Sequence, residues 1–331
     1  MLPGFGYVRP ESLSQAVKEL SAPETMLLAG GTDLLPCLRE HIFTPRNLVS
    51  LKKLTGLKGI KENTEGGLRI GALTTVAEVA AHPLIRERYP GLAQAAAEVA
   101  SPQLRNQGTL AGNLCQKPRC WYYRGEFDCL RKGGDICFAI GGENAYHAIF
   151  GGDPCFIVHP SDTAPALTAL GARVKTSGPK GGRAIPLDKF FLLPEESLTT
   201  ETVLEAAELV TGILLPPPVP GQKSSYRKVR ARGSWDFALA GLALALSFKG
   251  ETVKTARAVF SGAAPKPWPA PGIEELITGQ KITPDLARRA ARAALEEAEP
   301  MEQNGYKVPL FKGVIEEELL KMAGGGAEAG A

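Results

Sequence analysis

Short apolar runs separated by polar turns dominate the first hundred residues. PESLSQAVKEL (10–20) has the spacing of a helix, whereas TMLLA (25–29) and NLVSL (47–51) are brief apolar runs typical of buried strands. A second unit follows, with a strand at LRIGAL (68–73) and short alanine-rich helices between residues 75 and 100. This alternation predicts two small α/β lobes in the N-terminal part of the chain.

The pattern changes after LVTGILLPP (209–217), an apolar run that reads as a strand ended by prolines. PPPVPGQ (216–222) can continue neither a helix nor a sheet, so it is the predicted linker. Beyond it, SSYRKVRAR, FALAGLALALSF and VKTARAVFSG predict three strands, and PDLARRAARAALEEAE predicts an amphipathic helix. The expected organisation is a first domain at 1–215 with lobes at about 1–56 and 57–215, a linker at 216–222, an α+β domain at 223–322 and a disordered tail at 323–331.

Composition narrows the class of protein. With 44% apolar and 22% charged residues the chain is typical of globular proteins, and its net charge of +3 is too small to predict binding to nucleic acid or an anionic membrane. No apolar run approaches the roughly 20 residues of a spanning helix, and the N-terminus lacks a secretory signal, so we expect a cytoplasmic protein. One basic cluster reads either as a solvated strand edge or as a contact to an anionic ligand or partner: Lys223, Arg227, Lys228, Arg230 and Arg232.

Two glycine-containing turns suggest where a ligand binds. AGGTDLLP (29–36) follows the predicted strand at 25–29, and GTLAGN (108–113) follows the alanine-rich helices. Glycine lets a ligand approach backbone amides closely, which is how phosphates are commonly held, although many tight turns look the same. Because the turns lie about eighty residues apart, one ligand could be held from two strand ends.

Four segments follow one another along the chain in this order: AGGTDLLP, TLAGN (109–113), PSD (160–162) and YRKVRARGSWDFA (226–238). Together they resemble the FAD-binding medium subunits of the molybdenum hydroxylase family, which includes xanthine dehydrogenase and carbon monoxide dehydrogenase. The resemblance covers nearly the whole chain. It implies an α+β fold: a two-lobed FAD-binding domain of the vanillyl-alcohol-oxidase (PCMH) type, followed by a small domain with a three-stranded antiparallel sheet and helices.

The resemblance also implies roles for individual residues. The segment from Ala29 to Leu35 is expected to hold the FAD pyrophosphate, Asp162 to accept a hydrogen bond from the cofactor, and Lys228 to stabilise the anionic reduced flavin. Out of context, Asp162 reads as a helix cap, and Arg227 competes with Lys228. No residue is expected to act on a substrate. The expected FAD contacts are Leu28, Ala29, Gly30, Gly31, Thr32, Asp33, Leu34, Leu35, Thr109, Ala111, Gly112, Asn113, Asp162 and Lys228.

Five of the six cysteines lie between residues 115 and 155, which in a cytosolic chain suggests metal ligation before disulfides. They fall in an insertion, at about 114–156, that separates two FAD-binding segments. This insertion resembles one in the flavin subunit of 4-hydroxybenzoyl-CoA reductase, which holds a four-iron four-sulfur cluster through four cysteines. Cys120, Cys129 and Cys137 match the first three ligands.

The fourth ligand departs from that pattern, because Tyr146 stands where the fourth cysteine is expected. Cys155 is the expected substitute, and Cys115 is its competitor. Zinc at the same four thiolates, or free and partly oxidised cysteines, are the alternatives. Other residues are expected to be structural: His147 as a hydrogen-bonding group, Cys37 as a packed thiol, and Trp121, Tyr122 and Tyr123 as core of the insertion or as a shield for the cluster.

The expected function is electron transfer between FAD and iron–sulfur centres. By resemblance, the partners are a large molybdopterin subunit and a small subunit with two two-iron clusters, with NAD or ferredoxin as soluble carrier. One alternative is a stand-alone flavin reductase resembling UDP-N-acetylenolpyruvoylglucosamine reductase, but the sequence offers no proton donor placed for it. Another is a metal-stabilised assembly module without redox turnover.

Overall fold

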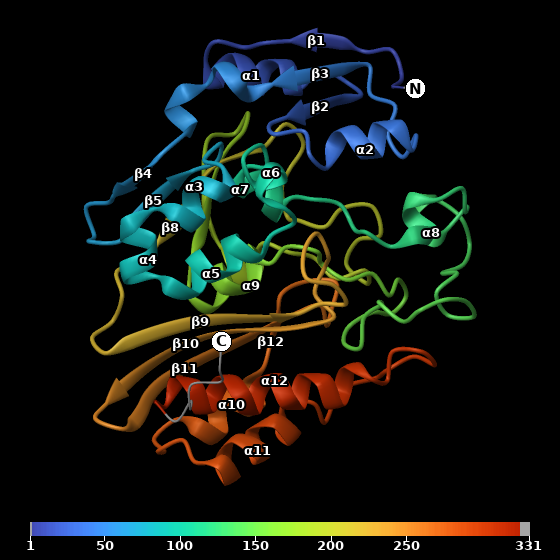
Figure 1. Cartoon of the computed structure of the whole chain (residues 1–331). Helices are drawn as coiled ribbons and strands as arrows, with labels where there is room; N and C mark the ends of the chain where they lie inside the picture. Colours follow the sequence, from blue (N-terminus) through green and yellow to red (C-terminus); the bar gives the residue numbers. More distant parts are fainter. Residues whose placement is uncertain (1, 325–331) are drawn as a thin grey trace.

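The computed structural model describes residues 2–324, arranged in three stacked layers with one insertion projecting to the side (Figure 1). The first layer is a parallel sheet in the order β1-β3-β2. Its elements are β1 (Gly6–Val8), α1 (Leu13–Leu20), β2 (Thr25–Leu28), α2 (Leu34–Arg39) and β3 (Asn47–Ser50). The predicted helix and both predicted strands are confirmed here, whereas the short strand β1 was not predicted.

The middle layer is a five-stranded antiparallel sheet in the order β4-β5-β8-β6-β7, with helices packed against it. The strand β8 lies at its centre and is almost wholly buried, which explains its continuous apolar sequence. Strands are β4 (Ile60–Glu62), β5 (Leu68–Gly71), β6 (Arg173–Ser177), β7 (Ala184–Pro186) and β8 (Leu209–Leu215). Helices are α3 (Val76–Ala81), α4 (Pro83–Arg88), α5 (Pro90–Glu98), α6 (Pro102–Arg105), α7 (Leu110–Leu114) and α9 (Thr163–Ala169).

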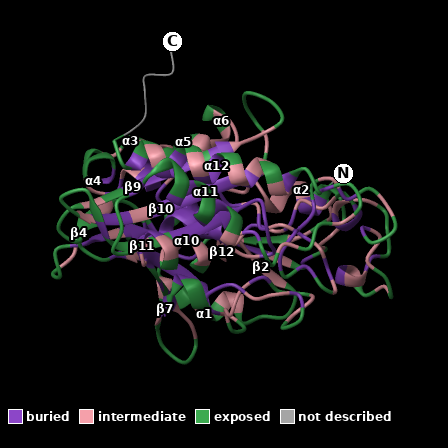
Figure 2. Ribbon diagram, turned by 90° about the horizontal axis from the view of Figure 1, so that it is seen from below, coloured by how far each residue is buried: buried purple, intermediate pink, exposed green. Residues whose placement is uncertain are grey.

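The third layer is an antiparallel sheet in the order β12-β11-β10-β9, with three helices packed against it. Buried residues concentrate in this sheet and its helices (Figure 2). Its strands are β9 (Gln222–Val229), β10 (Ala240–Lys249), β11 (Thr252–Ser261) and β12 (Trp268–Pro269), and its helices are α10 (Pro271–Ile277), α11 (Pro284–Ala293) and α12 (Lys307–Met322). The expected three-stranded sheet is therefore corrected to four strands, because Trp268 pairs with Phe260 in a strand too short to leave a sequence pattern.

The residues between β8 and β9 coincide with the predicted linker, although the domain limits themselves stay a prediction. The predicted disordered tail lies mostly outside the described residues, since 325–331 are not described. The cysteine-rich insertion has little regular structure apart from α8 (Trp121–Arg124) and a single 3-10 turn at Leu130–Lys132. Within residues 2–324, no helix is long and apolar enough to cross a membrane.

Candidate cofactor sites

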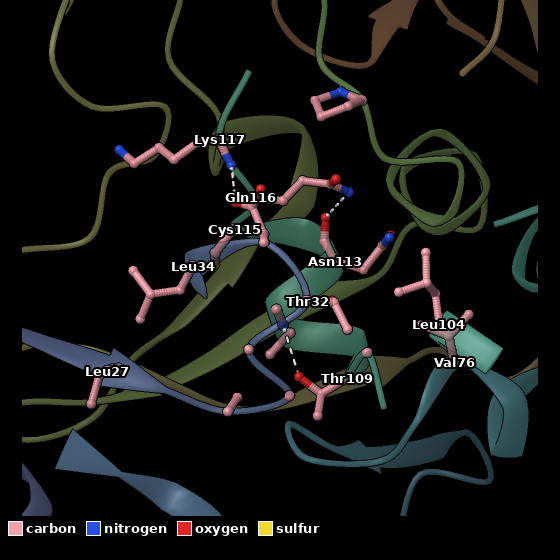
Figure 3. Close-up of a pocket in the computed structure, with 18 of the residues that line it drawn as sticks. Leu27, Thr32, Leu34, Val76, Leu104, Thr109, Asn113, Cys115, Gln116 and Lys117 are labelled. Atoms are coloured by element: carbon pink, nitrogen blue, oxygen red, sulfur yellow. Dashed lines mark hydrogen bonds between the residues drawn. The ribbon is translucent and has the colours of Figure 1, made fainter. Parts of the chain in front are cut away.

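The two glycine-containing turns meet at one end of the first two layers. A Cβ atom built on Gly30 would clash with the backbone oxygen of Gln107, so the first turn lies directly against the segment that leads into the second. The neighbouring Gly31 has a φ of +78°, which favours glycine. Thr32 and Thr109 thereby face one cavity from two different lobes (Figure 3).

The second turn is fixed by local hydrogen bonds. Thr109 caps α7, with its side chain accepting from the amide of Gly112 at 3.2 Å. The Oδ1 atom of Asn113 accepts hydrogen bonds from Ser161 Oγ at 2.6 Å and Thr163 Oγ1 at 2.7 Å. The start of α9 therefore positions Asn113, and the segments TLAGN and PSD form one structural unit.

Between the two turns lies a cavity of about 450 Å³, within the usual range of small-molecule sites. Most of the residues predicted to contact FAD line this cavity: Ala29, Gly30, Gly31, Thr32, Asp33, Leu34, Thr109, Ala111, Gly112, Asn113 and Asp162. Leu28, Leu35 and Lys228 do not. The wall is completed by three residues of the third layer that were not predicted to contact FAD: Trp235, Asp236 and Phe237. The aromatic residues Trp235 and Phe237 within YRKVRARGSWDFA could have indicated this part of the cavity wall.

Asp162, which lines the cavity, forms a buried ion pair with Lys228, which lies behind it. Lys228 Nζ lies 2.8 Å from Asp162 Oδ2, and the hydroxyl of Tyr226 donates to Asp162 Oδ1 at 2.7 Å. Burial raises the pKa of the Asp162 carboxyl, although the Lys228 charge opposes that shift. Lys228 Nζ also donates to the carbonyls of Glu98 and Asp236, so it holds Asp162 and the 235–237 wall in place rather than lining the cavity.

A second, much smaller cavity lies inside the insertion. The side chains of Cys120, Cys129, Cys137 and Cys155 all line it, together with His147, and its volume is about 10 Å³. The other two cysteines lie elsewhere, because Cys115 lines the larger cavity and Cys37 is buried in α2. Tyr146, which stands at the expected position of the fourth ligand, is 51% exposed and does not line this cavity.

The four thiols have different environments. His147 Nε2 lies 3.3 Å from Cys120 Sγ, while burial raises the pKa of Cys120 to about 11. A hydrogen bond from the Cys155 thiol lowers the pKa of the Cys137 thiol. Within residues 2–324, no three His, Cys, Asp or Glu side chains are already arranged as ligands of one metal ion.

Ion pairs, most of them partly buried, connect the two cavities. Asp33, in the first turn, lies 2.9 Å from Arg119 Nη2 and 2.8 Å from Arg124 Nη2, both in the insertion. Glu201 pairs with Lys117, which lines the larger cavity, at 2.6 Å, and also with Arg131, which lines the cysteine cavity. The insertion is thus fastened to the walls of the larger cavity.

The fold and the larger cavity define a two-lobed nucleotide-binding protein with an added C-terminal domain. Residues 3–218 match the FAD-binding domain in molybdopterin dehydrogenase, and residues 224–321 match the CO dehydrogenase flavoprotein C-terminal domain. The chain therefore belongs to the FAD-binding medium subunits of the molybdenum hydroxylase (xanthine dehydrogenase) family, and it is an FAD-binding subunit of an oxidoreductase.

Individual relatives agree with this assignment. The aldehyde oxidoreductase FAD-binding subunit PaoB of Escherichia coli K12 is 37% identical over 93% of this chain and 95% of its own. The carbon monoxide dehydrogenase medium chain of Hydrogenophaga pseudoflava is 31% identical over 91% of this chain and 89% of its own. Among solved structures, carbon monoxide dehydrogenase from the same organism aligns with a TM-score of 0.77 and 28% identity over 98% of both chains. The resemblance of the insertion to 4-hydroxybenzoyl-CoA reductase stays a prediction.

Proposed function

We propose that this chain passes electrons between its FAD and iron–sulfur centres, one of which is a four-iron four-sulfur cluster held by Cys120, Cys129, Cys137 and Cys155. The observation that supports this is the convergence of four cysteines, spread over 36 residues of sequence, on one cavity beside the flavin pocket. When bound, FAD supplies the exchange between two-electron and one-electron transfer, and the cluster supplies a one-electron centre.

The chain's own residues would bind and orient FAD. The residues of the first turn line the cavity, and their backbone amides would hold the pyrophosphate, as backbone amides commonly do. The amides at the N-terminus of α7 are already hydrogen-bonded within the protein, so the second turn would contribute its side chains, such as Thr109 and Asn113. Asp162 offers a buried acceptor to the cofactor, and Lys228 keeps that carboxylate in position. Trp235 and Phe237 would limit the access of water to the bound cofactor.

The four cysteines that line the smaller cavity suit an iron–sulfur cluster, since four thiolates are its usual ligands. Cys155 is proposed as the fourth ligand rather than Cys115, because Cys155 lines the cysteine cavity and Cys115 lines the flavin cavity. A cavity of about 10 Å³ holds no cluster, so the cysteine side chains would have to turn outward on loading. Gly133, Gly134, Gly141 and Gly142 lie in the connecting loops, which are free of helix and strand and would allow this adjustment.

The proposed partners follow from the relatives. PaoB is named as a subunit of an aldehyde oxidoreductase, and the other relative as the medium chain of carbon monoxide dehydrogenase. We propose that this chain likewise works with a large molybdopterin subunit and a small subunit holding two two-iron clusters. A soluble carrier, NAD or ferredoxin in the sequence-based expectation, would complete the electron path.

Metal, sulfide and flavin analysis of the anaerobically purified chain tests the proposal. We expect about four iron and four sulfide per FAD, with a paramagnetic resonance signal of a cluster after reduction. Cys155→Ser is expected to lose most of the iron and keep FAD, whereas Cys115→Ser, the matched control, is expected to keep its iron. Zinc without sulfide, or unchanged iron content in Cys155→Ser, would contradict the proposed ligand set.

A further inference from the structure

The insertion exposes an unusual concentration of large apolar side chains. Eleven such residues are exposed in residues 2–324, and five of them lie within the 26 residues from 121 to 146. Their exposed fractions are 40% for Trp121, 43% for Phe127, 56% for Ile136, 61% for Ile140 and 51% for Tyr146. We call these five side chains the insertion surface. Two of them, Trp121 and Tyr146, lie edge-on with ring centroids 5.6 Å apart, and exposed apolar side chains that gather on a surface are typical of an interaction site.

The insertion surface lies directly outside the cysteine cavity. Trp121 and Ile136 are the immediate sequence neighbours of Cys120 and Cys137, which line the cavity. Phe127 packs edge-on against Tyr122, another cavity residue, with ring centroids 5.0 Å apart. Because these side chains are adjacent in sequence to, or packed against, residues that line the cavity, a molecule bound to them would lie close to the four thiols.

Negative charge surrounds the insertion surface. Every fully exposed charged residue between 121 and 146 is acidic: Glu126, Asp128, Asp135 and Glu143. The basic residues of this stretch are engaged inward, since Arg124 pairs with Asp33, Arg131 pairs with Glu201, and Lys132 donates to the carbonyl of Gly125.

The segment at 296–302 extends this acidic rim. It contains Glu296, Glu297, Glu299 and Glu302, all exposed, and no basic residue. It lies against the insertion, because the amide of Glu299 donates to the carbonyl of Ile149 at 2.8 Å. Just beyond it, the amide of Gln303 donates to Asn144 Oδ1 at 2.9 Å. The chain as a whole is slightly basic at +3, so the negative charge here is a local feature.

We propose that the insertion surface docks a further soluble electron-transfer protein, distinct from the NAD or ferredoxin carrier, whose contact face is apolar and rimmed by lysine or arginine. This inference rests on the proposed cluster. The proposed cluster, reduced by the flavin, would supply one electron to the one-electron acceptor of the docked protein, with no bond formed and no proton moved. Opposite charges would speed the encounter, and a small apolar contact would let the product dissociate.

Stopped-flow oxidation of the photoreduced, FAD- and iron-loaded chain tests the docking. Ferricytochrome c, whose haem edge is ringed by lysines, and an acidic plant-type ferredoxin serve as oppositely charged acceptors. We expect the second-order rate constant with cytochrome c to fall at least about ten-fold between low and about 0.3 M salt. The reaction with ferredoxin should be slower at low salt and should not be slowed by added salt.

Two double variants address the surface itself. Ile136→Ser with Ile140→Ser, and Asp128→Lys with Asp135→Lys, are each expected to slow cytochrome c reduction about ten-fold while FAD and iron contents stay unchanged. The matched controls are Val219→Ser and Glu65→Lys, exposed positions outside the insertion, which should leave the rate unchanged.

Several results would overturn the docking proposal. They are faster reduction of ferredoxin than of cytochrome c at low salt, equal slowing by the control variants, or release of a partner subunit from the assembled complex by the surface variants. Failure of the cluster proposal is recognised separately, because the wild-type chain would then contain FAD without iron. In that case salt-dependent binding of redox-inactive zinc-substituted cytochrome c still tests the surface.

Discussion

Gly30 occupies a position where the absence of a side chain sets the geometry of the flavin pocket. The first turn and the segment at 107–108 approach each other across this residue, and the backbone oxygen of Gln107 fills the space that a Cβ atom would need. Any larger residue must therefore push the two turns apart. Because the turns line the same cavity from different lobes, that displacement would also move the amides of the first turn, which are expected to hold the pyrophosphate, away from the second turn.

Gly30→Ala is therefore expected to weaken FAD binding at least about ten-fold and to lower the free energy of unfolding by about 1–3 kcal/mol. FAD content after purification, and FAD titration of the stripped chain, measure the first effect. Gly56→Ala is the matched control, since nothing lies within 4 Å of the corresponding Cβ position. Normal FAD binding by Gly30→Ala would show that the close approach of the two turns is unimportant.

Asp33 has long-range partners that its local sequence does not indicate. Its place in AGGTDLLP predicted a contact to FAD, and it does line the cavity. Its carboxylate, however, also accepts from Arg124 Nη2, 91 residues away, and from the backbone amide of Lys117. These partners lie in the insertion, so no local pattern around Asp33 could have indicated them. The residue joins the flavin turn to the cysteine-rich segment.

At the scale of elements, strands with long or alternating apolar patterns were predictable and short edge strands were not. The central strands β8 and β10 are buried for most of their length, and β11 is buried over its last four residues, so their sequences contain recognisable apolar runs. The strands β1, β7 and β12 have two or three residues and lie at sheet edges, where packing demands little of their sequence. The cavity within the insertion forms from loops without periodicity. The resemblance to a known insertion indicated three of its four cysteines, and Cys155 was inferred because Tyr146 stands at the fourth position.

Glu201 holds the insertion against the flavin lobe. Its side chain is 8% exposed and pairs with Arg131, whose side chain is 2% exposed. Glu201→Gln would leave that buried guanidinium without an opposite charge, and the expected loss is about 3 kcal/mol in the free energy of unfolding. Urea unfolding measures the loss, and proteolysis within 121–146 reports whether the insertion detaches first.

The exposed Glu195 provides the matched control, because Glu195→Gln should leave stability within about 0.5 kcal/mol of the wild type. Since Glu201 also contacts Lys117 in the flavin cavity, we expect Glu201→Gln to reduce FAD and iron contents together. Loss of neither cofactor, with wild-type stability, would mean that the two cavities are independent.

At the scale of the whole molecule, the C-terminal layer contributes residues to the wall of the flavin cavity and anchors the insertion that contains the cysteine cavity. It supplies Lys228 to the buried pair with Asp162 and the 235–237 wall to the flavin cavity. It also supplies Lys307, at the start of α12, which is fully buried and donates to the carbonyls of Tyr146, His147 and Gly262 at 2.8–3.1 Å. Lys307 thus anchors the end of the insertion to β11 and α12.

Burial lowers the pKa of Lys307 from 10.5 to about 7. Between these two values the unfolded chain keeps a proton on this lysine while the folded chain releases it, so the unfolded state binds more protons. Stability contributed through Lys307 must therefore rise as pH increases from about 7 towards 10, by at most about 1.4 kcal/mol per pH unit. Below about pH 7 both states are protonated, and the dependence disappears.

Lys307→Met removes this titration and leaves three carbonyls without their donor. Urea unfolding at pH 7, 8 and 9 should show the wild type gaining stability relative to Lys307→Met as pH rises. Lys254→Met, at an exposed position of β11, should differ from the wild type by the same amount at every pH. A stability difference between the wild type and Lys307→Met that stays constant from pH 7 to 9 would mean that Lys307 keeps its proton in the folded chain, held by the three carbonyls.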